Sequence, residues 1–393
     1  MQATGNGVIC PRIEVDLAKI EYNTRALVTL LSDRGIDVTG VTKATLGSPE
    51  VASAMIAGGV SRLGDSRLEN LEALRHAGIQ TPLTLLRSPT PDQAERAVAS
   101  ANISQVSELD VVKALSVAAG RRGVVHGLVL MVELGDLREG VMPGDVLDIA
   151  RRVLLTPHVT LAGLGTNLAC RAGVVPSADN MGELSALATL IEARLGLHLP
   201  LVSGGNSANL AWALAAPAGR VNDLRLGESI LLGCDPLTRV PLSGLYTDAL
   251  TLVVPVIESL AKPTVPRGAT GETAFGVATP MGERGTIIQT IAAIGRQDVD
   301  PDGLTPPTGH RCSRRQQRPS GTGNATSPGP RHGDPLRARL LGPAARDDVS
   351  VRDDPLRRYD TPAVLPAVVS PPAPPPSPPP FANRSAAAAA ATR

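Results

Sequence analysis

A single lysine, Lys43, stands at the end of a short apolar run that starts at Val38, just before a helix-like segment. The chain has only four lysines and many arginines, so a lysine at this place is unusual for the composition. A partly desolvated lysine amine can lose its proton and form a Schiff base with an aldehyde, whereas arginine is always protonated. The alternative is a solvated lysine at a strand end with no chemical role.

A glycine-rich segment, Ser203 to Ser207, follows a second apolar run and opens a helix. Its small residues would let a phosphate reach backbone N–H groups at the positive end of a helix dipole, and the Ser207 hydroxyl could add a hydrogen bond. Gly227 lies in the next strand-like run, and two adjacent strand ends that form one phosphate site recur in parallel barrels. The alternative is an ordinary glycine turn.

Two arginines stand beside these segments and need partners. Arg225 lies in a mostly apolar run, where an unpaired guanidinium would be costly. Its partner could be a carboxylate, Asp223 or Glu228, or else a ring nitrogen or an anionic group of a ligand. Arg138 has the same ambiguity, because an ion pair with Glu133 in the same loop would satisfy both residues.

Strand-like and helix-like runs alternate eight times in the first 230 residues. This count predicts an α/β fold, a closed (β/α)8 barrel of the TIM type, with a doubly wound open sheet as the alternative. In such a barrel, chemistry takes place at the carboxyl ends of the strands, where all the residues singled out above are found. The strand-like runs are at about 38–43, 61–65, 81–87, 102–106, 127–134, 160–167, 199–204 and 222–229.

The pattern changes twice after the barrel. Residues 1–235 form the expected barrel, and residues 236–305 show alternating β-type runs without long helices, which predicts a small β domain. Residues 306–393 hold 18 of the 35 prolines and end in an alanine run. Such a segment cannot bury enough apolar surface to offset its ordering entropy, so we expect a disordered tail.

Composition excludes several classes of function. Residues 306–393 carry a balance of +7, so residues 1–305 are mildly acidic and offer no electrostatic reason to bind nucleic acid or an anionic membrane. Aromatic residues make up 2%, too few to stack nucleic-acid bases. The four cysteines lack paired spacing and the histidines lack a second ligand at useful spacing, which predicts no metal site and fits a reducing cytoplasm. No apolar run is long enough to cross a membrane.

Taken together and in this order, the motifs resemble the fold-type III pyridoxal-phosphate enzymes of the alanine racemase N-terminal family, and within it the ornithine racemase-like branch. The resemblance covers about residues 11–304. It is carried by Pro11-Arg-Ile-Glu-Val-Asp-Leu17, Gly40-Val-Thr-Lys43, Leu63-Gly-Asp-Ser-Arg67-Leu-Glu-Asn70, Leu134-Gly-Asp-Leu-Arg-Glu-Gly140, Gly165-Thr-Asn-Leu-Ala-Cys170, Ser203 to Ser207, Arg225-Leu-Gly-Glu228 and Ala293-Ile-Gly-Arg-Gln-Asp-Val299.

The resemblance implies a role for each matched residue. Lys43 matches the lysine that binds pyridoxal 5'-phosphate covalently and serves as one acid/base group, and Arg225 matches the arginine that faces the pyridine nitrogen. Arg138 matches an arginine near the ring and the substrate carboxylate. The remaining residues expected to bind the cofactor are Asn167, Ser203, Asn206, Ser207, Gly227 and Glu228.

The implied activity is racemisation of a free amino acid at Cα by two-base proton transfer, with ornithine or a related amino acid as the preferred substrate, in a cytoplasmic homodimer if the β domain is intact. Alanine racemases take the second acid/base from a tyrosine of the partner subunit, but the matching place here is Phe275. Cys170, Tyr246 and Asp298 are then the candidates. The alternative is a non-catalytic protein that binds or carries the cofactor.

The tail also departs from the family, whose members continue with further strands of the small domain. We hypothesise a shift of reading frame near residues 306–309, because GC-rich codons read out of register give arginine, proline and alanine. The β domain would then be incomplete.

Overall fold

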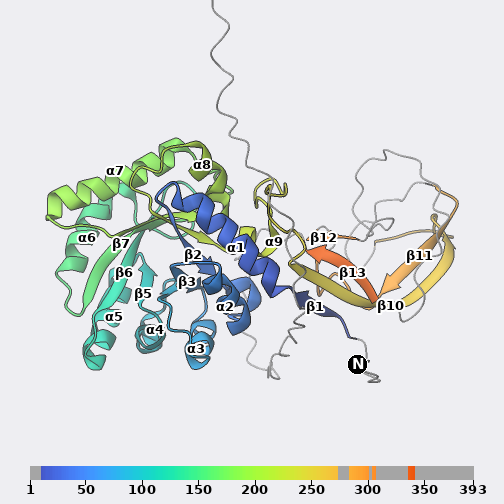
Figure 1. Cartoon of the computed structure of the whole chain (residues 1–393), viewed down its shortest axis with the longest axis horizontal. Helices are drawn as coiled ribbons and strands as arrows, with labels where there is room; N and C mark the ends of the chain where they lie inside the picture. The colour runs from blue at the N-terminus through green and yellow to red at the C-terminus, as the bar shows by residue number, and fades with distance from the viewer. Residues whose placement is uncertain (1–9, 273–282, 301–302, 307–334, 341–393) are drawn as a thin grey trace, which may run out of the picture.

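The computed structural model describes residues 10–272, 283–300, 303–306 and 335–340. Figure 1 shows two bodies in this part of the chain. One is a ring of parallel strands surrounded by helices, and the other is a small antiparallel sheet beside it.

Eight parallel strands close into a barrel, because the first of them, β2, pairs with the last, β9. In this closing pair Thr39 lies opposite Arg225. The expected (β/α)8 barrel is therefore confirmed, and the open doubly wound sheet is excluded. The strands are β2 (Asp37–Val41), β3 (Arg62–Asp65), β4 (Leu83–Leu85), β5 (Ile103–Val106), β6 (His126–Val132), β7 (Val159–Thr166), β8 (Leu201–Asn206) and β9 (Asp223–Leu226).

Helices follow the strands around the barrel, and their starts use the signals seen in the sequence. At α2, Pro49 takes the first helical position and the Ser48 hydroxyl accepts a hydrogen bond from Val51 N at 3.3 Å. The α-helices are α1 (Leu17–Ser32), α2 (Pro49–Ala57), α3 (Leu68–His76), α4 (Ala94–Ser100), α5 (Leu109–Arg122), α6 (Val146–Leu154), α7 (Ala178–Leu195), α8 (Leu210–Ala215) and α9 (Glu228–Leu232). Short 3-10 helices lie in the connections at η1 (Lys43–Thr45), η2 (Pro91–Gln93), η3 (Pro143–Asp145) and η4 (Ser207–Asn209).

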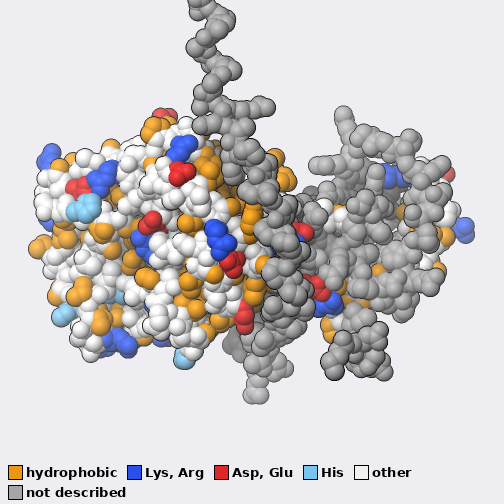
Figure 2. All heavy atoms as spheres, viewed as in Figure 1, with side chains coloured by type: hydrophobic (Ala, Val, Ile, Leu, Met, Phe, Trp, Pro, Cys, Tyr) orange, Lys and Arg blue, Asp and Glu red, His pale blue; other side chains and the backbone are white. Residues whose placement is uncertain are grey.

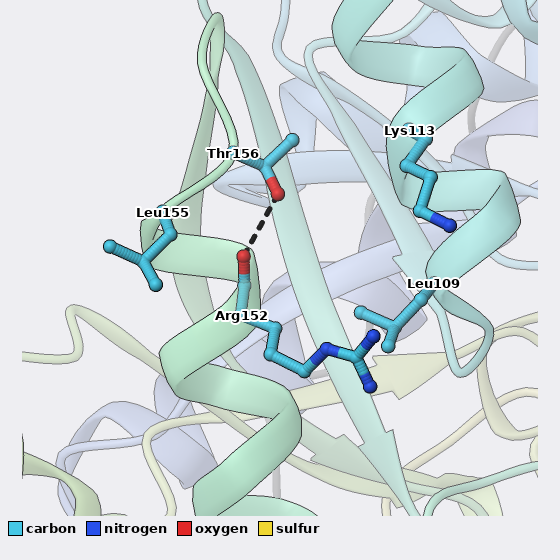
Figure 3. A pocket seen from close by; sticks show the side chains of 5 residues that line it. All are labelled: Leu109, Lys113, Arg152, Leu155 and Thr156. Atoms are coloured by element: carbon cyan, nitrogen blue, oxygen red, sulfur yellow. Dashed lines mark hydrogen bonds between the residues drawn. The ribbon is translucent and has the colours of Figure 1, made fainter.

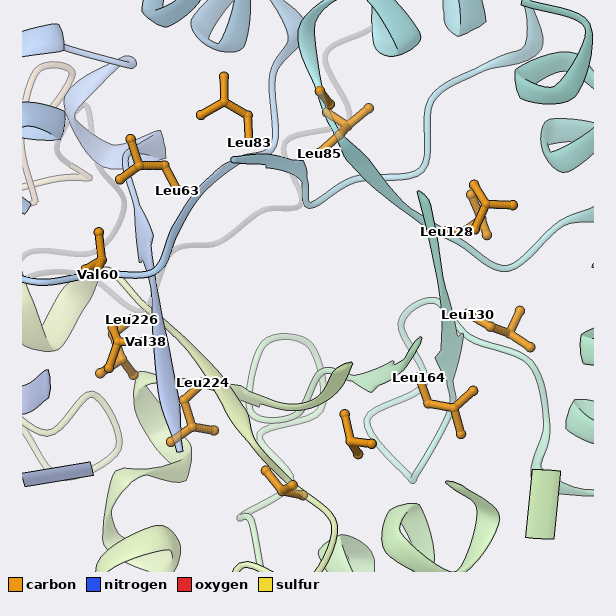
Figure 4. Packing of buried hydrophobic residues seen from close by; sticks show 14 of the residues in the cluster. Val38, Val60, Leu63, Leu83, Leu85, Leu128, Leu130, Leu164, Leu224 and Leu226 are labelled. Atoms are coloured by element: carbon orange, nitrogen blue, oxygen red, sulfur yellow. The ribbon is translucent and has the colours of Figure 1, made fainter. Parts of the chain in front are cut away.

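The barrel strands divide their side chains between two cores. On β6, Leu128 and Leu130 belong to the large cluster of buried residues, whereas Val129 and Met131 form a separate cluster with Leu201. Because successive side chains of a strand point to opposite faces, the two clusters lie on opposite sides of the sheet. Figure 4 shows members of the large cluster, with Leu128 pointing away from the ring of strands toward the helices.

The second body is a five-stranded sheet in the order β1-β10-β13-β12, with β11 paired to β10. Its strands are β1 (Arg12–Val15), β10 (Leu250–Pro263), β11 (Thr286–Ala292), β12 (Leu304–Thr305) and β13 (Pro335–Leu340). The chain therefore contributes its first described strand to this sheet and not to the barrel. The side chain of Asn23 on α1 ties α9 and the connection that leads to β10 to this helix, since it binds Ile230 O at 2.9 Å and both the N–H and the carbonyl of Tyr246 at 2.8 Å.

One segment differs from the sequence-based expectation. Pro335–Leu340 lies within the tail that we expected to be disordered, yet it forms β13 and pairs with β10 and β12. Expecting all of 306–393 to lack structure was thus wrong for these six residues. The reason is that backbone pairing along the edge of β10 satisfies N–H and C=O groups whatever the average composition of the tail. Residues 307–334 and 341–393 lie outside the described residues.

Charges are mixed on the surface. On the visible face of the barrel, Figure 2 shows basic and acidic side chains beside one another, interspersed with apolar ones. None of the helices in the described part of the chain combines the length and the hydropathy that crossing a bilayer requires.

Candidate active site at the barrel mouth

Lys43 stands where β2 ends and η1 begins, at the carboxyl end of a barrel strand as the sequence predicts. The preceding residue, Thr42, has no exposed surface. Its N–H donates to Gly64 O at 3.1 Å, and its carbonyl accepts from Thr45 N at 3.0 Å. Because these two hydrogen bonds fix the backbone of Thr42, the backbone of Lys43 has a defined position at the mouth of the barrel.

Asp65, the last residue of β3, joins the loop after β2 to the loop after β3. Its fully buried carboxylate accepts hydrogen bonds from Thr42 Oγ1 at 2.7 Å and from Asn70 Nδ2 at 3.0 Å. Arg67 N donates to the same carboxylate at 3.0 Å. Burial raises the pKa of Asp65 and these hydrogen bonds act against that shift. The buried carboxylate is therefore compensated, and it anchors the segment that carries Lys43.

Arg225 points inside the barrel and is held by neutral groups. Its Nη1 donates to Ser203 Oγ at 2.6 Å and its Nη2 to Thr166 O at 2.7 Å. Ser203 Oγ in turn donates to Asp223 Oδ2 at 2.5 Å. Burial lowers the pKa of Arg225 and the charge of Asp223 raises it, but a guanidinium stays protonated. Of the two carboxylates considered from the sequence, Asp223 thus compensates Arg225 through a serine.

Glu228, the other carboxylate considered, has a different partner. Its Oε1 forms an ion pair with Arg239 Nη1. Burial raises the pKa of Glu228, while the nearby charges of Arg239 and Lys43 lower it. Glu228 therefore lies near the lysine, and Arg239 with its left-handed backbone (φ 62°) holds it there.

The ends of β8 and β9 meet as expected for a phosphate site. Ser229 N donates to Ser207 Oγ at 3.2 Å, and both serines are buried. A Cβ atom added to Gly227 would lie 3.1 Å from Val41 Cβ, so a side chain there would push the end of β9 away from β2. The Oγ of Ser229 is buried and has no hydrogen-bond partner among the described residues.

Two asparagines line the mouth between β7 and β8. Asn206 Nδ2 donates to Leu168 O at 2.8 Å, to Asn167 Oδ1 at 3.2 Å and to Cys170 Sγ at 3.5 Å. The same Asn167 Oδ1 accepts from Arg225 Nη2 at 3.4 Å. The Nδ2 of Asn167 is buried without a partner among the described residues. The mouth therefore has a second polar atom that a ligand could satisfy.

Two carboxylates stiffen the loops that carry Arg138 and Cys170. Glu133 accepts hydrogen bonds from three N–H groups of its own loop, including Arg138 N at 3.2 Å. The fully buried Asp136 accepts four from the loop after β7, including Cys170 N at 3.0 Å. The guanidinium of Arg138 pairs with Glu139 at 2.6 Å. The two loops are thus one unit over the mouth.

The candidates for a second acid/base lie in different places. Cys170 lies on the loop after β7, where its sulfur accepts a hydrogen bond from Asn206 Nδ2 at 3.5 Å. The ring of Tyr246 packs edge-on against Tyr22 with centroids 5.0 Å apart, beside α1. Asp298 Oδ2 accepts from Gly295 N at 2.9 Å in a turn after β11. Of these three side chains, Cys170 is therefore the one that the described contacts place at the mouth. The equivalent of the family tyrosine, Phe275, lies outside the described residues.

A separate groove of about 230 Å³ lies on the outside of the barrel (Figure 3). Leu109, Lys113, Arg152, Leu155 and Thr156 line it. Lys113 is paired with Asp110 at 2.8 Å, and Thr156 Oγ1 donates to Arg152 O. It shares no residue with the mouth. Within the described ranges, histidine, cysteine and acidic side chains form no group that could hold a metal ion.

Comparison with known proteins agrees with this geometry. A model of the alanine racemase N-terminal domain matches residues 15–236. The chain belongs to this family. It is 33% identical over 302 residues to the lysine racemase of Thermotoga maritima, covering 76% of this chain and 84% of the relative. It is also 33% identical over 299 residues to the ornithine racemase of Acetoanaerobium sticklandii, covering 75% and 84%.

Solved structures support the fold. The alanine racemase of a D-cycloserine-producing Streptomyces lavendulae matches with a TM-score of 0.55 at 22% identity, covering 66% of this chain and 68% of that one. The resemblance drawn from the motifs is therefore confirmed at the level of the family and the barrel.

The residues of the mouth fit the cofactor that the resemblance implies. Asn167 Nδ2 and Ser229 Oγ are buried polar atoms without partners, and Lys43 and Arg225 open onto the same mouth. A phosphorylated pyridine aldehyde offers acceptor atoms for both orphaned groups. The sequence analysis assigned no individual role to Ser229, Asp65, Asp136 or Glu139, which the structure places beside the candidate residues. The signal was present for three of them, since they stand inside motifs quoted for the resemblance.

Proposed function

We propose that the chain is a pyridoxal-phosphate-dependent racemase of a free basic amino acid, ornithine or a related one. The observation that carries this proposal is the convergence of Lys43, Arg225 and the Ser207–Ser229 pair on one barrel mouth. The names of the two relatives at 33% identity, a lysine racemase and an ornithine racemase, support the choice of substrate.

When bound, pyridoxal phosphate withdraws electrons from Cα of the attached amino acid and makes its proton acidic. Lys43 would hold the cofactor and move the proton on one face of Cα. The hydroxyls of Ser207, which accepts from Ser229 N, and of Ser229, whose Oγ has no partner among the described residues, would hold the phosphate, with Gly227 letting the strand ends approach. Arg225 would donate to the pyridine nitrogen, and because it stays charged it keeps that nitrogen unprotonated.

Inversion needs a second proton carrier on the opposite face of Cα. We assign this part to Cys170, whose sulfur contacts Asn206 and lies near the charge of Arg225. Arg138 would bind the substrate carboxylate and orient Cα between the two groups. The small-molecule substrate, the homodimer and the cytoplasmic location stay predictions.

Exchange of solvent deuterium into Cα tests this function. The loaded protein is incubated in deuterated water with L-ornithine, L-lysine or L-alanine, and both label and enantiomer are followed. We expect deuterated D-ornithine to form. Cofactor binding with no exchange on any amino acid would instead establish the alternative, a non-catalytic cofactor-binding protein. In Cys170→Ala, we expect racemisation to fall while Lys43 still takes up the cofactor.

A further inference from the structure

An acidic side chain, Glu139, stands at a place where the expected ligands are anionic. Its Oε2 is 2.6 Å from Arg138 Nε, and the two side chains are 27% and 21% exposed, so a ligand can reach both. A phosphorylated cofactor and an amino-acid carboxylate are attracted by arginines and repelled by a carboxylate. The position of Glu139 therefore needs an explanation beyond anion binding.

Glu139 faces arginines from several parts of the barrel. Burial raises the pKa of its carboxyl, and the charges of Arg138, Arg225 and Arg87 lower it. Arg225 belongs to β9, and Arg87 follows β4. Glu139, on the loop after β6, therefore has arginines from two other strand ends nearby and is still accessible to a ligand.

The backbone constrains the turn that carries Glu139. Gly140, the next residue, has φ 149°, and a Cβ there would lie 2.4 Å from Glu133 N. Glu133 in turn holds Arg138 N at 3.2 Å. The pair of Arg138 and Glu139 is thus presented by a rigid turn, which suits a residue that recognises a ligand.

The other acidic side chains of the mouth are engaged elsewhere. Glu133 and Asp136 accept backbone N–H groups, and the fully buried Asp65 is bound by Thr42 and Asn70. Asp223 is bound by Ser203, and Glu228 by Arg239. Among the described residues of the mouth, Glu139 and Glu228 are thus the acids that pair with an arginine side chain, and the partner of Glu139 is Arg138, the arginine expected to bind the substrate carboxylate.

We propose that Glu139 binds the side-chain ammonium of the substrate while Arg138 binds its α-carboxylate. When the diamino acid binds, the ion pair between Arg138 and Glu139 is replaced by two ion pairs with the substrate, so both side chains and both substrate groups keep a partner. This selects a substrate with a terminal ammonium over one with a neutral side chain of the same length. The inference rests on the proposed function and adds the residue that sets its specificity.

The test compares ornithine with norvaline, which has the same three-carbon chain without the ammonium. In Glu139→Gln, kcat/KM for ornithine should fall about 10- to 100-fold, mainly through KM, because a hydrogen bond to a charged group is lost. The kcat/KM for norvaline should stay within about twofold of the wild-type value. Glu95→Gln is the control, because it removes an exposed charge paired with Arg121 on the outside of the barrel and should change neither value.

The outcomes separate this inference from the proposed function. If the wild-type protein racemises neither amino acid, the proposed function is wrong. If it racemises both and Glu139→Gln lowers both equally, the proposed function stands and the role of Glu139 is refuted. Should the variant fail to fold, the wild-type protein decides alone: equal kcat/KM for ornithine and norvaline would overturn the inference, and a preference of about tenfold or more for ornithine would uphold it.

Discussion

Replacing Ser203 by alanine should disturb the core of the site more than any other loss of a single hydroxyl. Its Oγ lies between two buried charges, 2.6 Å from Arg225 Nη1 and 2.5 Å from Asp223 Oδ2. Each hydrogen bond to a charged group contributes about 1.5–3 kcal/mol. Arg225 keeps its bond to Thr166 O, and Asp223 keeps Thr39 Oγ1 at 2.6 Å and its ion pair with Arg62 Nη1 at 3.2 Å. We therefore expect a net loss of about 3 kcal/mol and a fall in Tm of about 6–12 °C.

The protein offers a matched control for this measurement. Ser229 is also fully buried, but its Oγ has no partner among the described residues. Ser229→Ala removes a buried hydroxyl that has no partner and should therefore not lower the unfolding free energy of the cofactor-free protein. Thermal and urea unfolding of both variants give the comparison. Equal losses of stability in Ser203→Ala and Ser229→Ala would refute the view that the Ser203 hydroxyl stabilises the protein by linking Arg225 to Asp223.

Three further outcomes follow from buried polar groups. Burial lowers the pKa of His126 from 6.5 to about 4, so its contribution to stability is complete above pH 6.5, falls by about 3 kcal/mol between pH 6.5 and pH 4, and then levels off. His126→Gln should flatten this dependence in urea unfolding, and an unchanged profile would contradict it. Thr42→Val removes one hydrogen-bond donor to Asp65, so it should lower the unfolding free energy by about 2 kcal/mol and slow racemisation. Thr42→Ser should retain both the stability and the rate. Identical behaviour of the two variants would contradict the view that Asp65 anchors the segment that carries Lys43. The hydrogen bond from Arg220 lowers the pKa of Glu192 from 4.5 to about 2. The stability that Glu192 contributes is therefore complete above pH 4.5 and disappears toward pH 2. Glu192→Gln should be less stable than the wild-type protein at pH 7 but not at pH 2, which thermal unfolding followed by circular dichroism would detect.

Several features could be predicted from the sequence because they depend on local pattern. The alternation of strand-like and helix-like runs predicted the eight strands, since the barrel strands carry apolar residues and are bounded by turn residues. The rule that chemistry lies at strand carboxyl ends then brought Lys43, Ser207 and Arg225 to one mouth. Both steps use information that lies within about ten residues of each position.

Other features depend on contacts between distant segments and left no local pattern. Asp136 binds a loop that starts 34 residues later, at Cys170 N. The link between Arg225 and Asp223 runs through Ser203, which the sequence assigned to the phosphate site. The strand Pro335–Leu340 pairs with residues about 85 positions earlier in the chain, a distance at which composition carries no information.

Covalent trapping of the cofactor tests the central claim most directly. The purified chain is mixed with pyridoxal phosphate, its visible absorbance is recorded, and the mixture is reduced with borohydride before peptide mapping. We predict loss of the visible band on reduction and a stable pyridoxyl group on Lys43, absent from Lys43→Ala. A folded protein that carries no such group on Lys43, or that carries it equally on Lys19 and Lys262, would contradict the assignment of the barrel mouth as a pyridoxal-phosphate site.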